Sequence, residues 1–537
     1  MQQVIEAIEG VYQRAHDNVK ALVTEGDRIS AKKLNENQLA AHAVAYLATE
    51  LEACRQMAAW AERVGGDYED KVARAYIGEV ARAIVGGVDL GACENIGLGE
   101  LGITEADLRD TVLRPEVVAF STEHASGQVY LELAAHARDH GFPNPGFEDE
   151  MLDEIRSQFS KFVDAEVLPQ AQEIHRNDAL IPMGIVDQMS ELGVFGLTIP
   201  EEYDGLGMSK VAMCVVTEEL SRGYIGVGSL GTRSEIAAEL IMGGGTEEQK
   251  KNWLPRLAAG EVLSTAVFTE PNIGSDLAHL GTRAVKQDDG SYVINGQKTW
   301  ITHAARADLM TVLARTNASE PGYRGLSMFL AEKTRRSRDE GETEFVDEGL
   351  TGTEIKVLGY RGMGEYELSF EDFKLPADSL LGGEEGAGFK QLMRTFESAR
   401  IQTAARGVGV AQAALEDAIL YATEREQFGG PIFQFPRVAR KIGRMVVRIQ
   451  AGRQMTYFSA REKDQEKRCD LQAGMAKLLA TRCAWEAADA NVQIHGGNGY
   501  AEEYTASRLL VDARVLSLFE GANEIQAHVV ARRLLES

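Results

Sequence analysis

The chain has few basic residues for its length, little cysteine and no long apolar run. Its 537 residues include 56 Lys and Arg against 82 Asp and Glu, which gives a formal net charge of -26. A surface this acidic repels phosphate backbones, so we expect no nucleic-acid partner. An anionic small ligand remains compatible with this charge, because a pocket can be locally basic.

The cysteines and the missing apolar runs limit the chemistry and the compartment. The five cysteines are Cys54, Cys93, Cys214, Cys469 and Cys483, and none of them form a CxxC or another metal-binding spacing. We therefore expect reduced thiols and no metal site. No segment approaches the roughly 20 apolar residues of a membrane span, and the first residues lack a basic start followed by an apolar run. These features predict a cytoplasmic protein without a membrane partner.

Apolar spacing and turn residues divide the chain into four segments. We expect an N-terminal helical extension over 1–145, a second helical domain over 146–262, a middle β domain over 263–380 and a C-terminal helical bundle over 381–537. The first boundary is marked by the Gly- and Pro-rich stretch GFPNPGF, and the second segment is interrupted by a loop at 199–209. Because strands and helices are segregated, the order predicts an α+β multidomain protein and not a βαβ fold.

The middle segment predicts several strands. The runs 309–316, 326–333 and 366–373 are rich in β-branched, aromatic and other apolar residues, and Asn295-Gly296 predicts a hairpin turn. The charged stretch 333–345 is typical of a solvated loop.

One glycine pair could be mistaken for a dinucleotide-binding fingerprint. Gly407-Val408-Gly409 lies inside a helical pattern, Gln412 stands where the third glycine belongs, and no strand precedes it. We interpret these glycines as a site of close helix packing.

Two segments of the middle domain suit a flat, polar ligand. Phe268 leads from a strand into the turn Thr269-Glu270-Pro271-Asn272-Ile273-Gly274-Ser275-Asp276, which exposes backbone N–H groups and hydroxyls. Further on, Trp300 and Thr302 are two residues apart on a strand and are expected on one face, where an indole and a hydroxyl can meet a heterocycle. An ordinary turn and a half-buried core Trp are the alternatives, and each has about equal weight.

Three helix ends carry further candidates. Arg425 and Phe428 follow one long helix, and Gln493 and Gly497 stand in a glycine-rich turn after another, so that these segments fit either a phosphate contact or a plain helix stop. Near the C-terminus, Glu520-Gly521 follows apolar residues. A lone Glu there is usually solvated, but partial burial would raise its pKa and suit a catalytic base.

Taken together and in this order, the motifs closely resemble those of the acyl-CoA dehydrogenase family, over about 150–537. The resemblance implies a helical domain, a β-barrel-like middle domain and a C-terminal four-helix bundle, preceded here by the extra helical extension. It implies FAD as the cofactor, an acyl-CoA substrate and an electron-transfer flavoprotein as electron acceptor. The FAD contacts that it implies are Phe268, Thr269, Gly274, Ser275, Trp300, Thr302, Arg425, Phe428, Gln493 and Gly497. The substrate contacts are Ser275, Glu397, Arg400 and Gly521.

The same resemblance implies that Glu520 is the catalytic base. Some members place the base at the position that Ala399 occupies here, and alanine cannot be a base. Ala522 departs from the threonine of many members, which removes one hydroxyl near the cofactor. The implied reaction is removal of an α proton by Glu520 while a hydride leaves the β carbon for the flavin.

The extension and one arginine limit the range of acyl groups that we expect as substrate. With its long N-terminal extension, the chain resembles a member of the family that acts on a short, branched acyl group with a free carboxylate. That carboxylate needs a buried partner, for which Arg233 is our candidate, with a surface arginine as the equal alternative. The extension also suggests a homodimer, because it can cover the face that other members use to form tetramers. The pattern Ala-x-Arg-Gln-Met at 53–57 recurs at 451–455, by partial duplication of a bundle helix or by chance.

Other functions are also compatible with parts of the sequence. Another short-chain or dicarboxylyl dehydrogenase, or an acyl-CoA oxidase, would share the fold and Glu520. A flavoprotein monooxygenase would normally lack that Glu. A DNA-binding stress protein of related fold would need a basic patch, which the net charge disfavours.

Overall fold

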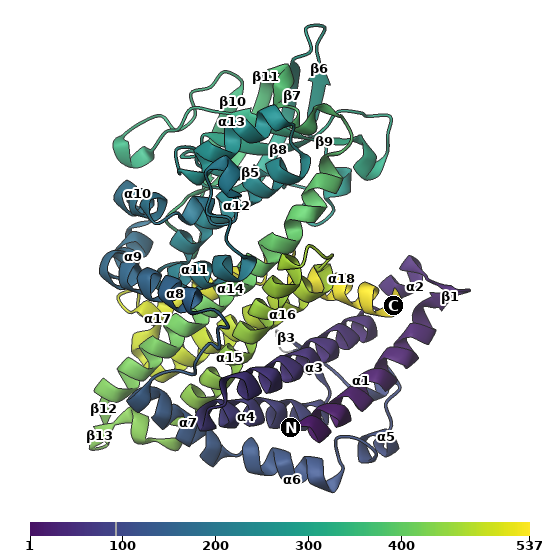
Figure 1. Ribbon diagram of the computed structural model, residues 1–537, viewed down its shortest axis with the longest axis vertical. Helices are drawn as coiled ribbons and strands as arrows, with labels where there is room; N and C mark the ends of the chain where they lie inside the picture. Colours follow the sequence, from purple (N-terminus) through teal and green to yellow (C-terminus); the bar gives the residue numbers. More distant parts are fainter. Residues whose placement is uncertain (92–93, 537) are drawn as a thin grey trace. The chain divides into compact units, whose positions relative to one another are not determined.

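The computed structural model describes residues 1–91 and 94–536, so Cys93 lies outside the described residues. The chain folds into two compact units, each of which is contiguous in space (Figure 1). Unit 1 consists of Met1–Glu154 and Thr403–Ser537, and unit 2 consists of Ile155–Gln402. The N-terminal extension and the C-terminal helices therefore form one folded body.

The extension is mostly helical, as the sequence predicts. Its elements are α1 (Gln2–Val23), β1 (Thr24–Glu25), β2 (Arg28–Ile29), α2 (Ala31–Glu36), α3 (Gln38–Val64), α4 (Asp67–Ile84), β3 (Val88–Gly91), β4 (Glu94–Ile96), α5 (Glu105–Arg109), α6 (Pro115–His124) and α7 (Gly127–His140). The two short antiparallel strand pairs were not predicted. Strands this short carry too little of the alternating pattern to be recognised from sequence.

The C-terminal segment is a set of helices, some of which pack directly on the extension. They are α14 (Gly388–Glu424), α15 (Pro436–Asp464), α16 (Asp470–His495), α17 (Thr505–Val515) and α18 (Asn523–Glu536), with the small hairpin β12 (Glu426–Gln427) and β13 (Gly430–Pro431) after α14. Within unit 1, α3 and α7 lie along α15, and α3 also lies along α18 (Figure 1). At Gly443 of α15 an added Cβ would lie 1.9 Å from the Tyr130 carbonyl oxygen of α7, so only glycine allows this approach.

Gly407 has the packing role that the sequence predicts for it. It lies inside α14, and an added Cβ would lie 3.0 Å from the Ala480 carbonyl oxygen of α16. The pattern repeated at 53–57 and 451–455 falls within α3 and α15, two helices that contact each other.

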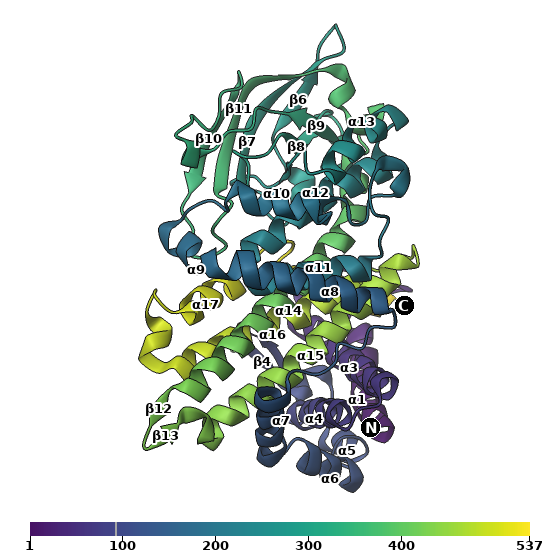
Figure 2. The same ribbon diagram turned by 60° about the vertical axis from the view of Figure 1, so that its left-hand side comes forward.

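Unit 2 combines a helical layer with one sheet. Its helices are α8 (Glu150–Phe162), which begins in unit 1, α9 (Leu168–Asn177), α10 (Met183–Glu191), α11 (Lys210–Gly223), α12 (Ile225–Gly244) and α13 (Glu247–Ala258). The strands are β5 (Ser264–Val267), β6 (Arg283–Lys286), β7 (Tyr292–Thr302), β8 (Leu309–Arg315), β9 (Leu326–Glu332), β10 (Leu350–Ile355) and β11 (Glu365–Leu375). They form a seven-stranded sheet in the order β10-β11-β7-β6-β8-β5, with β9 paired to β8 (Figure 2).

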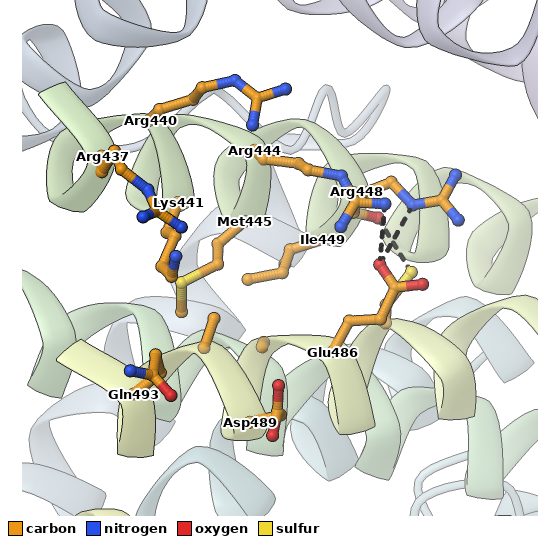
Figure 3. A pocket seen from close by; sticks show the side chains of 13 residues that line it. Arg437, Arg440, Lys441, Arg444, Met445, Arg448, Ile449, Glu486, Asp489 and Gln493 are labelled. Atoms are coloured by element: carbon orange, nitrogen blue, oxygen red, sulfur yellow. Dashed lines mark hydrogen bonds and ion pairs between the residues drawn. The ribbon is translucent and has the colours of Figure 1, made fainter. Parts of the chain in front are cut away.

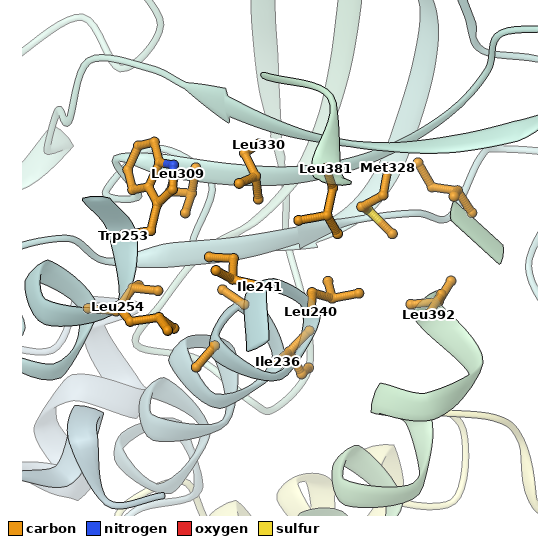
Figure 4. Close-up of a cluster of buried hydrophobic side chains, with 14 of the residues drawn as sticks. Ile236, Leu240, Ile241, Trp253, Leu254, Leu309, Met328, Leu330, Leu381 and Leu392 are labelled. Carbon is orange, nitrogen blue, oxygen red and sulfur yellow. The ribbon is translucent and has the colours of Figure 1, made fainter. Parts of the chain in front are cut away.

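The helical layer of unit 2 is held to the sheet by an apolar core. Ile236, Leu240 and Ile241 of α12 face the sheet together with Trp253 and Leu254 of α13 (Figure 4). Leu309, Met328 and Leu330 of β8 and β9 lie opposite them, and all eight side chains are buried. Burial of each such side chain contributes about 1.5–3 kcal/mol, so this core stabilises the packing of the helices on the sheet.

The predicted strands at 309–316, 326–333 and 366–373 are confirmed as β8, β9 and part of β11, but the hairpin at Asn295-Gly296 is wrong. The strand β7 runs straight through these two residues, and the turn falls earlier, where the Gln287 N–H donates to the Ser291 carbonyl at 2.8 Å. Asn295 instead pairs with Asp372: its amide donates to Oδ1 at 3.0 Å and its oxygen accepts from the backbone N–H at 2.9 Å. The side chain thus bridges an irregularity in the β7–β11 register, a long-range role that no local pattern reveals.

The charged stretch 333–345 is not simply a solvated loop. Lys333 is buried, and its Nζ donates to the carbonyls of Ala305 at 2.9 Å and Ala307 at 3.0 Å. Burial lowers the pKa of Lys333 to about 8. This end of the stretch is therefore part of the packed domain.

No helix among the described residues is long and apolar enough to cross a membrane. Within residues 1–91 and 94–536 no three His, Cys, Asp or Glu side chains gather in a group that could hold a metal ion.

Candidate active site

Glu520 lies on a strained loop between α17 and α18 that is held from two helices. Its φ is 53°, a left-handed conformation that is unusual for a residue other than glycine, and Gly521 follows with φ 84°. Gln526 of α18 donates to the carbonyls of Glu520 at 3.2 Å and Gly521 at 3.3 Å. The fully buried Lys477 of α16 donates to the Gly521 carbonyl at 2.5 Å. The loop is thus fixed in a conformation that it would not adopt alone.

The Glu520 side chain faces a buried arginine. The Glu520 side chain is 12% exposed, and its Oε1 lies 4.0 Å from Nη2 of Arg406, whose side chain is fully buried in α14. The Arg406 guanidinium stacks over the Phe519 ring at 4.9 Å. The partial burial expected of Glu520 is confirmed, whereas Arg406 was missed. The signal was present, since an arginine inside the apolar stretch 401–415 requires a buried partner.

The turn after β5 is closed on itself and tied to β7. The Glu270 N–H and the Ile273 carbonyl bond at 2.9 Å, and the Thr269 carbonyl accepts from the Thr299 N–H at 3.0 Å. Phe268 is buried, whereas Gly274 and Ser275 are exposed, and an added Cβ on Gly274 would meet nothing within 4 Å. A fixed turn with open backbone and an exposed hydroxyl is the feature that a polar ligand edge needs.

A buried ion pair underlies this turn. Lys298 of β7 is fully buried, and its Nζ donates to the Phe268 carbonyl at 2.8 Å and to Glu270 Oε1 at 3.1 Å. The other oxygen of Glu270 accepts from the Gly281 N–H at 2.7 Å. Burial lowers the pKa of Lys298 to about 8, while Lys298 and the accepted hydrogen bonds lower the pKa of Glu270 against the effect of burial. The pairing was not predicted, because 28 residues separate its partners.

Trp300 and Thr302 differ in exposure, although strand alternation predicts that they share one face. Trp300 has φ 58° and leaves 58% of its surface exposed, whereas Thr302 is buried. Regular alternation therefore does not hold at Trp300, and a shared face for the two side chains stays a prediction. The Thr302 hydroxyl donates to Glu365 Oε2 at 3.0 Å, and burial raises the pKa of Glu365 to about 7.

The predicted substrate contacts in unit 2 lie on α12 and α14. Arg233 is buried in α12, and its charge lowers the pKa of Glu365 against the larger effect of burial. Glu397 and Arg400 are half-buried on α14, where the Arg400 guanidinium lies 6.0 Å from the Phe396 ring centroid. Ala399 between them is buried, so this helix offers no base at that position.

The predicted cofactor contacts of unit 1 lie at exposed helix ends. Phe428 occupies the tip of the β12–β13 hairpin with φ 54° and is 93% exposed, and Arg425 at the base of the hairpin is also exposed. At Gly497 an added Cβ would meet nothing within 4 Å. Both segments are therefore free to receive another surface within the described structure of unit 1.

Gln493 lines a basic cavity between α15 and α16 that the sequence reasoning missed (Figure 3). The cavity measures about 570 Å³ and is lined on α15 by Arg437, Arg440, Lys441, Arg444 and Arg448. Glu486 of α16 pairs with Arg444 at 3.2 Å and with Arg448 at 3.6 Å. Glu79 and Glu50 of the extension supply further partners to these two arginines. The extension therefore neutralises one end of the cavity.

The residues present fit FAD. The turn after β5 presents an open backbone and hydroxyls, Trp300 presents an exposed indole, and the arginine and glycine-rich turn of unit 1 suit phosphates. Unit 1 also carries the partly buried carboxylate of Glu520, which can take up a proton.

Three family models match the chain in series. They describe the N-terminal domain of acyl-CoA dehydrogenase at 149–261, the middle domain at 265–373 and the C-terminal domain at 386–535. The chain belongs to the acyl-CoA dehydrogenase family of enzymes.

Relatives and solved structures agree with this assignment. The chain is 54% identical to (2S)-methylsuccinyl-CoA dehydrogenase of Cereibacter sphaeroides, over 98% of this chain and 96% of that protein. Butyryl-CoA dehydrogenase from Megasphaera elsdenii superimposes with a TM-score of 0.68 at 33% identity and covers 72% of this chain and 99% of its own. A glutaryl-CoA dehydrogenase from Mycobacterium smegmatis in complex with FADH2 gives 0.65 at 28% identity, over 72% of this chain and 95% of its own. The N-terminal extension is thus shared with the first relative.

Proposed function

We propose that the protein oxidises (2S)-methylsuccinyl-CoA to mesaconyl-CoA, with FAD as cofactor and an electron-transfer flavoprotein as electron acceptor. The single observation that supports this substrate is the 54% identity to the Cereibacter enzyme, which extends over 98% of the chain and so includes the extension. The presence of a partly buried carboxylate on a fixed loop supports the reaction type.

Glu520 is the base in this proposal. Its carboxylate takes the α proton of the acyl group, and the Glu520 backbone N–H donates to the thioester carbonyl, which makes that proton more acidic. The α C–H bond breaks, the proton passes to the Glu520 carboxylate, and the electron pair forms the new double bond as the β C–H bond breaks. Bound FAD would supply the acceptor for the hydride that leaves the β carbon. Lys477 and Gln526 hold the loop so that carboxylate and N–H keep their relative positions.

Other residues bind and orient the cofactor and the substrate. Thr269, Ser275, Trp300 and Thr302 hold the flavin ring, with Phe268 and Gly274 shaping the turn. Arg425 and Phe428 contact the cofactor of a second subunit, and Gln493 and Gly497 contact the phosphates and adenosine of FAD. The active protein is therefore a homo-oligomer, and we propose a dimer. For the substrate, Glu397, Arg400 and Gly521 line the acyl-CoA path, and Arg233 pairs with the free carboxylate.

A screen of acyl-CoA thioesters with an artificial electron acceptor tests the substrate. We expect the highest kcat/KM with methylsuccinyl-CoA among the methylsuccinyl, glutaryl, isobutyryl and butyryl thioesters. A higher value with any of the other three contradicts the proposed substrate but not the family reaction. Reoxidation of the substrate-reduced enzyme in air, followed by stopped flow, separates a dehydrogenase from an oxidase.

The Arg233→Met variant tests the carboxylate partner. We expect it to lose selectivity for carboxylated over plain acyl-CoA, because the substrate charge would be left without a buried partner. Unchanged selectivity would contradict Arg233 as the partner of the substrate carboxylate.

A further inference from the structure

We propose that Arg406 is a positioning residue that keeps Glu520 ionised and adapts the site to an acyl group that carries a negative charge. This inference rests on the proposed function, because it assigns the residue through which the site tolerates an anionic acyl chain beside an anionic base. Arg406 belongs to α14 and Glu520 to the loop before α18, so the two meet only in the folded bundle.

The geometry holds the guanidinium in place. Nη2 of Arg406 donates to the Thr403 hydroxyl at 2.7 Å, one turn earlier on α14. The flat group lies 4.9 Å from the centroid of the Phe519 ring, the residue just before Glu520. With its side chain 0% exposed, the cation cannot be screened by water at that distance of 4.0 Å from Glu520 Oε1. A separation of 4.0 Å is an ion pair and not a hydrogen bond, so Arg406 acts on the Glu520 carboxylate through its charge.

The other charged groups of unit 1 near this loop have different roles. Lys477 of α16 donates to the Gly521 carbonyl of the loop at 2.5 Å and to Oδ1 of Asn523, the first residue of α18, at 3.4 Å. The negative charge of Glu524 on α18 acts to raise the pKa of His42 and of Tyr46, both on α3. On α17, Arg508 and Asp512 pair with each other at 3.9 Å. Within unit 1, Arg406 is a buried cation that the structure pairs with the Glu520 carboxylate.

A succinyl-type substrate adds a second negative charge next to Glu520. In any succinyl thioester the free carboxylate is attached to the β carbon, next to the α carbon that Glu520 must approach. Two carboxylates in one water-poor site raise each other's pKa, and one of them would then take up a proton before reaction. A protonated Glu520 could not act as a base. Arg406 offsets the charge of Glu520, whereas Arg233 is the proposed partner of the substrate carboxylate.

The experiment compares kcat/KM from pH 5.5 to 9 for methylsuccinyl-CoA and the uncharged butyryl-CoA in the wild type, Arg406→Gln and Arg406→Lys. For Arg406→Gln we expect the apparent pKa of the acid limb to rise by about one pH unit or more, because Glu520 loses its counter-charge. We also expect kcat/KM to fall about 100-fold with methylsuccinyl-CoA and about 10-fold with butyryl-CoA. Arg406→Lys keeps the charge and should restore most of the selectivity and the pH profile.

Arg453→Gln is the matched control. Arg453 is also a buried arginine of the bundle, but it donates to Gln450 at 2.7 Å and Gln412 at 3.0 Å, away from Glu520. Its loss should leave the pH profile and the substrate ratio unchanged. FAD absorbance of each purified variant reports on folding, and if Arg406→Gln does not fold, the lysine variant alone decides.

Equal losses with both substrates and an unmoved acid limb in Arg406→Gln would overturn the proposal, as would an Arg406→Lys variant that keeps FAD but loses the selectivity. A wild type that prefers butyryl-CoA would contradict the proposed substrate instead. In that case the shift of the acid limb still tests the pairing of Arg406 with Glu520.

Discussion

Lys298 shows how a single buried charge can organise a turn, here the one that follows β5. Replacement by Met removes the donor to Phe268 and leaves Glu270 buried without its cation. Loss of one partner of a buried pair typically costs about 3–5 kcal/mol. We expect Lys298→Met to unfold at lower urea concentration and to lose FAD on gel filtration. The exposed Lys374 in the same sheet is the control, and a Lys298→Met protein as stable and as yellow as Lys374→Met would contradict the role.

Glu365 predicts a specific pH dependence of stability. Its pKa is raised from 4.5 to about 7 in the folded protein, chiefly by burial. The folded state therefore holds the proton more tightly than the unfolded state, and stability falls as the pH rises from about 4.5 to 7, by about 3 kcal/mol for this group. Glu365→Gln cannot ionise and keeps an acceptor for Thr302.

Urea unfolding of the wild type and Glu365→Gln at pH 5 and pH 8 measures this contribution. We expect the variant to gain on the wild type between the two pH values. An equal difference at both pH values would show that Glu365 is ionised in the folded protein already at pH 5.

For single residues, the sequence predicts those that belong to motifs far better than those that contact the motifs from distant parts of the chain. Glu520 and the turn after β5 could be assigned because neighbouring residues form local patterns. Arg406, Glu270 with Lys298, and Glu365 could not, because each acts across distances in sequence that only the folded chain closes. Charged residues within buried segments were the unused signal.

Among the elements, the β12–β13 hairpin carries the clearest prediction. An aromatic ring that is 93% exposed at a hairpin tip is costly to leave in water and is typical of a contact surface. We propose that Phe428 contacts the cofactor and surface of a second subunit. Phe428→Ala should raise the FAD dissociation rate at least several-fold and weaken the oligomer, because an aromatic anchor contributes about 2 kcal/mol or more.

FAD release can be followed by the rise in flavin fluorescence on dilution. Leu420→Ala replaces another exposed apolar residue, on α14, and serves as the control. Equal FAD retention in Phe428→Ala and the wild type would remove the hairpin from the cofactor site.

Helices were predicted more accurately than strand connections. The apolar spacing of α3 or α15 extends over many turns, so the pattern is strong. The turn expected at Asn295-Gly296 failed because pairing with Asp372 on β11 outweighs the local preference of the two residues. A two-residue signal cannot include such a partner.

For the whole molecule, the extension is an integral part of the C-terminal body. Tyr130 and Tyr76 are fully buried in unit 1, and Glu79 and Glu50 pair with arginines of α15. Deletion of residues 1–140 would expose the apolar face of α15 and leave these arginines without partners. We expect the intact protein to be a dimer and the deletion variant to form tetramers or aggregates, as measured by light scattering. A tetramer of the intact chain would contradict the covering role.

The order of domains and the family were within reach of the sequence, since several motifs occur in a fixed order along 388 residues of the chain from 150 to 537. The joining of the extension to the bundle was not, because it depends on contacts such as Tyr130 against Gly443. Complementarity between two helix surfaces leaves no local pattern in the sequence from which it could be predicted.

The identity of the base is the central claim, and the Glu520→Gln variant tests it most directly. We expect single-turnover reduction of the flavin by methylsuccinyl-CoA to slow by about 10³-fold or more, because a positioned base contributes about 10²–10⁴ and an amide cannot take the proton. The variant should retain FAD and acyl-CoA binding, since the backbone N–H and the loop contacts remain. Flavin reduction within about tenfold of the wild-type rate would contradict the assignment of Glu520 as the base.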